Sequence, residues 1–230
     1  MRRDQGGKGA AARAPRRVSE GVAVLRLGVF GGTFDPPHIG HLAVAEEARD
    51  RLGLDRVLFV PAREPPHKPV GAASPPLARL ALVRAAVAGH PAFAVSELEL
   101  HRSGPSYTAD TLAEIGRSQP DAELFCLIGG DTAVQLHTWH DLPRLHALAT
   151  FVALLRPGWP RDRIEAWRAG QPPALRLVVL EVPGLDISAS GLRERVAGGR
   201  SIRYLVPDGV RRVIAEQGLY GGEVRADDGA

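Results

Sequence analysis

Two histidines stand at the start of a predicted helix, directly after a strand that ends in two glycines. The stretch GGTFDPPHIGHL covers Gly31 to Leu42 and follows the apolar segment VLRLGVF. His38 and His41 are three residues apart, so their side chains share one face of a helix that begins near Ile39. Glycine backbone N–H groups, the positive end of a helix dipole and two imidazoles all favour an anion. The spacing is neither that of a dinucleotide-binding G-x-G-x-x-G motif nor that of a P-loop, and it predicts a phosphate site.

A second chemical feature is the lysine in the stretch VPAREPPHKP, from Val60 to Pro69. Lys68 is one of only two lysines in the chain, the other being Lys8. A compact ammonium group in a rigid, proline-rich loop suits a phosphate, in a chain that otherwise uses arginine. An exposed loop cation is an equally good interpretation of Lys68 taken alone.

A third feature is the stretch LIGGDTAVQLHTWHDL, which also begins as a strand. Gly129 and Gly130 end that strand, and Asp131 follows at a position suited to a ribose hydroxyl. Trp139, next to His140, offers a flat ring for stacking on a base, although packing in the core is the simpler interpretation of a single tryptophan.

Serines and a threonine precede two further predicted helices. Capping of the helix that follows them is the simplest interpretation of Ser106 and Thr108, in SGPSYTADTL. Ser188 and Ser190, in DISASGLRERV, precede another helix, and Arg193 lies within its first turns. A cation near a helix N-terminus opposes the helix dipole, which makes sense if an anion binds there. A serine cap with solvent-facing arginines is the alternative.

Alternating apolar runs and helical patterns indicate the fold that positions these residues. The runs lack polar alternation, as expected for parallel strands covered on both faces, so we predict a Rossmann-like open parallel α/β sheet in a single domain. Ligands of such sheets bind beyond the carboxyl ends of the strands, where all four features lie. Predicted strands are Val24–Phe30, Arg56–Pro61, Phe93–Leu98, Glu123–Gly129, Phe151–Leu155 and Leu175–Leu180. Predicted helices are Ile39–Leu52, Leu77–Ala88, Thr108–Gly116, Leu142–Leu148, Arg161–Ala169, Ala189–Ala197 and Asp208–Glu216.

Charge and composition exclude several classes of protein. Residues 1–20 carry a net charge of +4 against +3 for all 230 residues, so the rest offers no excess positive charge to a nucleic acid. We expect a disordered basic tail over residues 1–23, a nucleotide-binding domain over 24–220 and a short tail over 221–230. No apolar run approaches the length of a membrane span, and Cys126 in ELFCLIGG is expected to be a buried strand thiol. These features favour a soluble, cytoplasmic protein.

The four features, in this order, resemble the nucleotidyltransferase superfamily with an H-x-G-H signature, and bacterial nicotinate-nucleotide adenylyltransferases above all. GGTFDPPHIGH meets the family pattern G-G-x-F-D-P-x-H-x-G-H in full, and the resemblance covers about residues 24–220. The family segments PPHK, SYTxDT, GxD, WH and YLVP (Tyr204–Pro207) are also present. The family usually reads ISSTxIR where this chain has ISASGLR, so Ala189 replaces a serine and Ser190 a threonine.

The resemblance implies that ATP and nicotinate mononucleotide react to give nicotinate adenine dinucleotide and pyrophosphate. It assigns catalytic roles to His38, His41, Lys68 and Arg193. It places the mononucleotide's carboxylate near backbone N–H groups of Thr108 and His140, which predicts a preference for nicotinate over nicotinamide. Implied ATP-binding residues are Gly31, Gly32, His38, His41, Gly129, Gly130, Asp131, Ser188, Ser190 and Arg193. Implied mononucleotide-binding residues are Thr33, Lys68, Tyr107, Thr108, Trp139 and His140.

The cofactor and partner predictions follow from the same resemblance. Mg²⁺ is expected to bridge the phosphates, bound mainly through substrate oxygens and water rather than by protein ligands. No third zinc-type ligand lies near the two histidines in the sequence, so no protein-held metal is expected. Partners are ATP and the mononucleotide, without nucleic acid or membrane, and a homo-oligomer is left open. A nicotinamide-nucleotide or pantetheine-phosphate adenylyltransferase and a non-catalytic nucleotide sensor are the alternatives.

Overall fold

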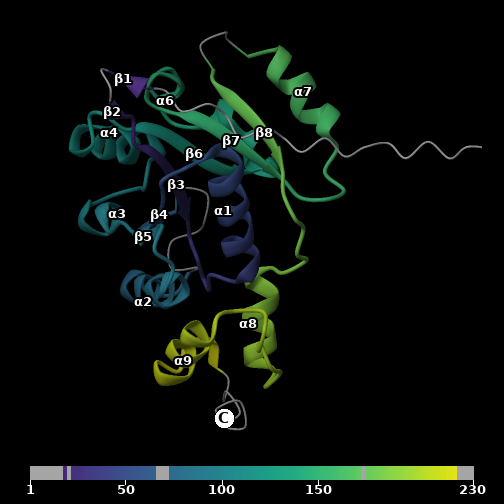
Figure 1. Ribbon diagram of the computed structural model, residues 1–230. Helices are drawn as coiled ribbons and strands as arrows, with labels where there is room; N and C mark the ends of the chain where they lie inside the picture. The colour runs from purple at the N-terminus through teal and green to yellow at the C-terminus, as the bar shows by residue number, and fades with distance from the viewer. Residues whose placement is uncertain (1–17, 20–21, 66–72, 172–174, 222–230) are drawn as a thin grey trace, which may run out of the picture.

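A six-stranded parallel sheet forms the centre of the molecule (Figure 1). The computed structural model describes residues 18–19, 22–65, 73–171 and 175–221. The strand order is β5-β4-β3-β6-β7-β8, so the chain winds outward from β3 on one side, returns to β6 beside it and winds outward again. This doubly wound order confirms the predicted Rossmann-like sheet. The strands are β3 (Arg26–Gly32), β4 (Arg56–Pro61), β5 (Phe93–Val95), β6 (Glu123–Gly129), β7 (Thr150–Leu155) and β8 (Leu177–Glu181).

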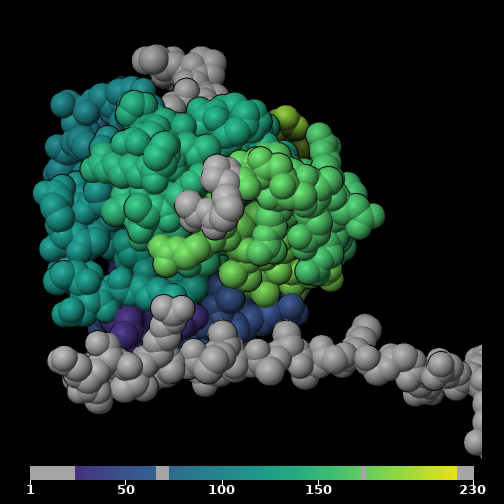
Figure 2. All heavy atoms as spheres, turned by 90° about the horizontal axis from the view of Figure 1, so that it is seen from above, coloured from purple at the N-terminus to yellow at the C-terminus, as the bar shows by residue number. Residues whose placement is uncertain are grey.

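Helices cover both faces of the sheet. They are α1 (Ile39–Leu52), α2 (Pro76–Val87), α3 (Leu98–His101), α4 (Thr108–Ser118), α5 (Gly130–Ala133), α6 (Leu142–Leu148), α7 (Arg161–Ala169), α8 (Ala189–Ala197) and α9 (Asp208–Glu216), with 3-10 turns η1 (Leu136–Thr138) and η2 (Leu219–Gly221). Seen from above, the dark blue residues of α1 lie along one edge, apart from the teal and green residues that cover the top (Figure 2). Within the described residues, no helix is both long and apolar enough to cross a membrane.

Alternate strand residues build the two sides of the core, as the pleat requires. On β6, Cys126 and Ile128 pack with α4, α6 and α7, whereas Phe125 and Leu127 pack with α1 and α2. Burial raises the pKa of Cys126 to about 12, so the predicted buried thiol is confirmed. A third apolar cluster joins α8 and α9 to α2, so the C-terminal helices pack against a helix that itself covers the sheet.

Most predicted elements lie within two residues of the observed ones, and one predicted strand extends too far at its C-terminal end. The strand expected over Phe93–Leu98 ends at Val95, and Leu98 begins α3 instead. Ser96 donates its N–H to the carbonyl of Phe59, which ends the ladder, and the chain then turns into the helix.

Regular structure also begins before the expected boundary at residue 24. β1 (Val18–Ser19) and β2 (Val22–Ala23) form a short antiparallel ribbon inside the segment expected to be a disordered tail. The rest of the N-terminal tail and residues 222–230 lie outside the described part of the chain.

Candidate active site

Two cavities open where the strand order reverses, beyond the carboxyl ends of β3 and β6. The aromatic cavity, about 630 Å³, is lined by Tyr107, Trp139 and His140 among others. The imidazole cavity, about 370 Å³, is lined by His38 and His41 among others. Both volumes are in the range of small-molecule sites. Gly31, Gly32 and Thr132 line both cavities, so two ligands bound there would meet at this wall.

The two histidines of the imidazole cavity form a stacked pair at the start of α1. Their ring centroids are 3.7 Å apart, and the backbone N–H of His38 donates to Nδ1 of His41 at 3.2 Å. Because Nδ1 of His41 accepts, a neutral His41 ring carries its hydrogen on Nε2. A Cβ on Gly40 would lie 3.0 Å from Nδ1 of His38, so the glycine in HIGH gives that ring its space. The predicted convergence of the two imidazoles is confirmed.

Burial and a nearby arginine keep both imidazoles neutral. The pKa of His38 is lowered to about 4, first by burial and then by the charge of Arg156. The pKa of His41 is lowered to about 3 by burial, by the adjacent His38 and by Arg156. Arg156 follows β7 and lines the imidazole cavity. We did not predict it from the sequence, although its place just after a predicted strand could have identified it.

The N-terminus of α8 forms another side of the imidazole cavity. Ser188 accepts the N–H of Gly191 at 3.1 Å, so the serine cap considered as the alternative at this helix is present, and its hydroxyl is 3.3 Å from that of Ser190. Ser188 and Ala189 line the cavity. Arg193 lies behind this wall, where its Nη1 donates to the backbone carbonyl of Asp35 at 2.8 Å. The structure therefore brings Arg193 to the histidine loop rather than into the cavity lining.

The glycines at the strand ends differ in what surrounds them. A Cβ on Gly31 would meet no atom within 4 Å, which leaves the backbone open to a ligand. Gly129 and Asp131 line the imidazole cavity beside it. Gly130 is buried, and a Cβ there would lie 2.6 Å from Cδ2 of Leu155, so this glycine serves the packing of α5 on β7.

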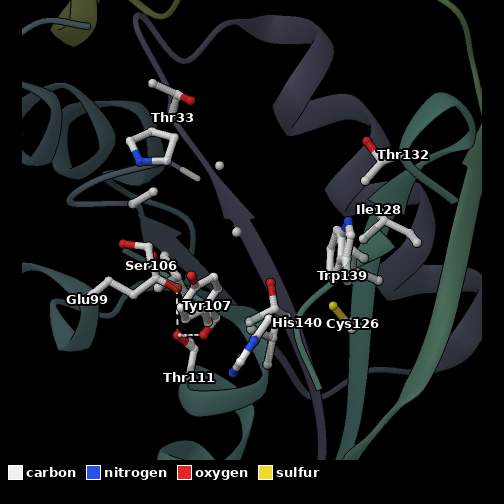
Figure 3. Close-up of a pocket in the computed structure, with 18 of the residues that line it drawn as sticks. Thr33, Glu99, Ser106, Tyr107, Thr111, Cys126, Ile128, Thr132, Trp139 and His140 are labelled. Carbon is white, nitrogen blue, oxygen red and sulfur yellow. Dashed lines mark hydrogen bonds between the residues drawn. The ribbon is translucent and has the colours of Figure 1, made fainter. Parts of the chain in front are cut away.

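Aromatic side chains face one another across the larger cavity (Figure 3). Tyr107 stacks on His140 with ring centroids 4.3 Å apart and planes 26° apart. Trp139 lies on the opposite side and is half-buried, in a T-shaped contact with Phe151 at 6.3 Å between ring centroids. Thr33 lies at the rim, near the wall shared with the imidazole cavity. A flat ring can enter between Trp139 and the Tyr107–His140 pair.

A buried acid lies at the base of the aromatic cavity, and the sequence analysis missed it. Glu99 accepts a hydrogen bond from the Thr111 hydroxyl at 2.6 Å, and burial raises the pKa of this carboxyl. The Ser106 hydroxyl accepts backbone N–H groups of Arg63 and Glu64 rather than capping α4. The N-cap of α4 is Tyr107, and no side chain caps it, so the capping interpretation of Ser106 and Thr108 is wrong.

Comparison with known proteins identifies the family of the chain. Residues 29–195 match the cytidylyltransferase-like family. A probable nicotinate-nucleotide adenylyltransferase of Geobacillus thermodenitrificans is 43% identical over 88% of this chain and 89% of its own length. Those of Exiguobacterium sibiricum and Thermomicrobium roseum are 47% and 48% identical over 85% of this chain, covering 99% and 91% of their own lengths. The chain belongs to this family of adenylyltransferases.

Solved structures of an adenylyltransferase share the fold of this chain. Nicotinic acid mononucleotide adenylyltransferase of Plasmodium falciparum, complexed with APC, superposes with a TM-score of 0.70 at 17% identity, covering 87% of this chain and 99% of that one. The same enzyme complexed with NaAD gives a TM-score of 0.69. At this level of identity the likeness supports the adenylyltransferase fold and does not assign site residues. Lys68, expected at the mononucleotide, lies outside the described residues.

Proposed function

We propose that this protein transfers the adenylyl group of ATP to the 5′-phosphate of nicotinate mononucleotide, giving nicotinate adenine dinucleotide and pyrophosphate. The observation that carries this proposal is the pair of cavities that share the wall of Gly31, Gly32 and Thr132. One cavity offers aromatic faces for a pyridine ring, and the other offers helix N-termini and imidazoles for phosphates. Transfer between two bound nucleotides needs such a shared wall, because the attacking oxygen and the α-phosphorus must meet there.

ATP is proposed to occupy the imidazole cavity. The Nε2–H of a neutral His41, with His38 beside it, can donate to the triphosphate, and the N-termini of α1 and α8 favour negative charge at the same place. Arg156 adds a positive charge at the cavity lining. Leu185 and Ile187 provide apolar surface for the adenine ring. Asp131 is placed for a ribose hydroxyl.

Nicotinate mononucleotide is proposed to occupy the aromatic cavity. Its pyridine ring stacks on Trp139, and its phosphate reaches the wall near Thr33. Backbone N–H groups near Thr108 and His140 are proposed to hold the carboxylate. Such donors satisfy an anion but leave the NH₂ group of an amide without an acceptor.

The chemistry follows from the charge of the nucleophile. The oxygen of a phosphate monoester is largely deprotonated at neutral pH, since its second pKa is about 6, so it attacks without a general base. One P–O bond forms to the α-phosphorus, and the bond to the leaving pyrophosphate breaks in line. We propose that the protein contributes positioning and hydrogen-bond donors for the charge that develops on the phosphoryl oxygens.

Magnesium enters this scheme with the nucleotide. Among the described residues, no group of three or more histidine, cysteine or acidic side chains is arranged to hold a metal ion. The donor set therefore fits Mg²⁺ that arrives as MgATP and is held mainly by phosphate oxygens and water.

The test is pyrophosphate release with ATP and Mg²⁺ and each of three acceptors. Nicotinate mononucleotide is expected to turn over with a kcat/KM at least about tenfold above that of nicotinamide mononucleotide, because an amide leaves backbone donors unpaired. Phosphopantetheine is expected to give no dinucleotide-type product. Comparable kcat/KM on the two mononucleotides contradicts the acid preference, and absence of pyrophosphate release with all three contradicts the transferase function.

A further inference from the structure

The segment from Gly31 to His38 separates the two cavities. Thr33 lines the aromatic cavity, whereas Phe34 and His38 line the imidazole cavity. If the proposed function is right, this segment, which we call the partition, sets the distance between the attacking phosphate and the α-phosphorus. A shift of about 1 Å in such a distance can cost a hundredfold in rate. What holds the partition in place therefore bears directly on turnover.

Three remote parts of the chain converge on one buried residue of the partition, Asp35. Its Oδ1 accepts the hydroxyl of Tyr220 at 2.8 Å, and its Oδ2 accepts the backbone N–H of Ser74 at 3.0 Å. Its backbone carbonyl accepts Nη1 of Arg193 at 2.8 Å. Asp35 is 3% exposed, so these bonds are made away from water. The C-terminal turn η2, the approach to α2 and helix α8 are thus all tied to the partition.

A buried arginine ties the neighbouring residue of the partition to the second strand end. The Arg79 guanidinium, 1% exposed, donates to the carbonyls of Thr33 at 3.0 Å, Arg63 at 3.1 Å and Ser74 at 2.9 Å. Thr33 follows β3 and Arg63 follows β4, so the planar guanidinium of Arg79 fixes the spacing of two loops at the cavity rim. Burial of the guanidinium lowers the pKa of Arg79, and the charge of Asp35 opposes that shift.

The backbone of the partition needs such support. Phe34 has a φ of 49°, in the left-handed region that a bulky residue rarely adopts. Its ring is buried against Phe30 and Phe59 and lies 5.3 Å from the ring of His41. The Phe34 ring thus connects the partition to the imidazole pair.

We propose that Tyr220 and Arg79 are positioning residues for adenylyl transfer: through Asp35 and Thr33 they hold the partition at the spacing that aligns the two substrates. Neither side chain lines either cavity. Removing one of their hydrogen bonds should disturb alignment, and hence kcat, more than the affinity for either substrate.

Tyr220→Phe is the first test, because it removes only the hydroxyl that reaches Asp35. We expect kcat to fall about five- to twentyfold, with Kd for nicotinate mononucleotide and for a non-reactive ATP analogue within about twofold of the wild-type values. Tyr204→Phe is the matched control, since Tyr204 is 83% exposed. Hydrogen exchange at residues 31–38 should quicken in Tyr220→Phe and not in Tyr204→Phe.

A double-mutant cycle tests whether Tyr220 acts through Asp35. Asp35→Ala should also lower kcat, and the double variant should lose little more than the worse single variant, because Asp35→Ala already removes the oxygen that Tyr220 contacts. Arg79→Lys, whose single ammonium cannot reach three carbonyls, should lower kcat further than Tyr220→Phe. If Arg79→Lys does not fold, the cycle at Tyr220 and Asp35 still tests whether hydrogen bonds to the partition set kcat.

The outcomes separate this proposal from the proposed function. A wild-type protein that releases no pyrophosphate contradicts the function, and exchange at residues 31–38 then still reports on the partition. An active wild type with unchanged kcat in Tyr220→Phe, measured well below both Tm values, overturns the positioning role. A fall in Tm without any change in kcat or in hydrogen exchange also overturns it, because Tyr220 would then only stabilise the fold.

Discussion

The imidazole cavity and the aromatic cavity are built in different ways, although they share a wall. The first takes both of its imidazoles from one run of residues, Gly31 to His41, and the rest of its lining from the end of β6, the end of β7 and the segment that leads into α8. The second takes its lining from the ends of β3 and β4, from Glu99 to Thr111, from β6 and from Thr138 to His140. The imidazole pair is thus local in the chain, whereas the stacking rings of the aromatic cavity come from segments far apart in the sequence.

Their electrostatics also differ. In the imidazole cavity, burial and Arg156 hold His38 and His41 neutral, so they can donate hydrogen bonds without adding positive charge. In the aromatic cavity, burial instead raises the pKa of an acid, Glu99, which Thr111 holds by a hydrogen bond. A local, donor-rich site should fail sharply when one donor is lost, and an assembled, stacked site should weaken in binding first.

His41→Ala should have the largest effect, because it removes the donor nearest the proposed transferring phosphate. We expect kcat to fall about a hundred- to thousandfold, the range for losing one preorganised donor to a charged transition state. Steady-state pyrophosphate release measures it. His137→Ala, at an exposed histidine, is the control. Turnover within a few-fold of wild type in His41→Ala would remove His41 from the mechanism.

Trp139→Ala should weaken substrate binding in the aromatic cavity. Loss of a stacking ring is worth about 1–3 kcal/mol, so the KM for nicotinate mononucleotide should rise about five- to 150-fold. The KM for ATP should stay within about threefold, and Trp139→Phe should recover most of the loss. Equal changes in the two KM values would mean that Trp139 supports the fold rather than one substrate.

The same contrast explains how much could be predicted from the sequence. Consecutive motifs revealed the strand ends, the helix at Ile39 and the histidine pair, because each is set by local chemistry. Arg79 and Tyr220 could not be assigned in this way, since their partners Thr33 and Asp35 are brought to them only by the packing of α2 and η2. Glu99 was missed because its position was assigned to no element, and only the turn after β5 places it in a cavity.

The neutral histidines predict that stability falls in acid. An unfolded histidine binds a proton near pH 6.5, but folded His38 and His41 do so only near 4 and 3, so unfolding takes up protons between these values. Stability is therefore fully present above about pH 6.5 and is lost as the pH falls, by on the order of 2–3 kcal/mol for His38 at pH 4.

Urea unfolding at several pH values measures this loss. The pH dependence should flatten in His38→Asn and stay unchanged in His137→Asn, whose ring is exposed. An unchanged slope in His38→Asn would contradict neutral burial of the pair, and with it the contrast between the two cavities.

Ala189→Ser should give the smallest effect, at the one position where the chain departs from the usual serine of its family. Ala189 lines the imidazole cavity, but Ser188 already caps α8, and the helix N-terminus presents its N–H groups whichever residue stands there. One added exposed hydroxyl is worth about 0.5–1 kcal/mol, so the KM for ATP should fall about two- to fivefold with kcat unchanged. Ala197→Ser, at the exposed far end of the same helix, is the control. A tenfold gain in kcat would instead mean that the imidazole cavity lacks a donor in the natural chain, and that phosphate recognition depends on α8 as much as on the histidine loop.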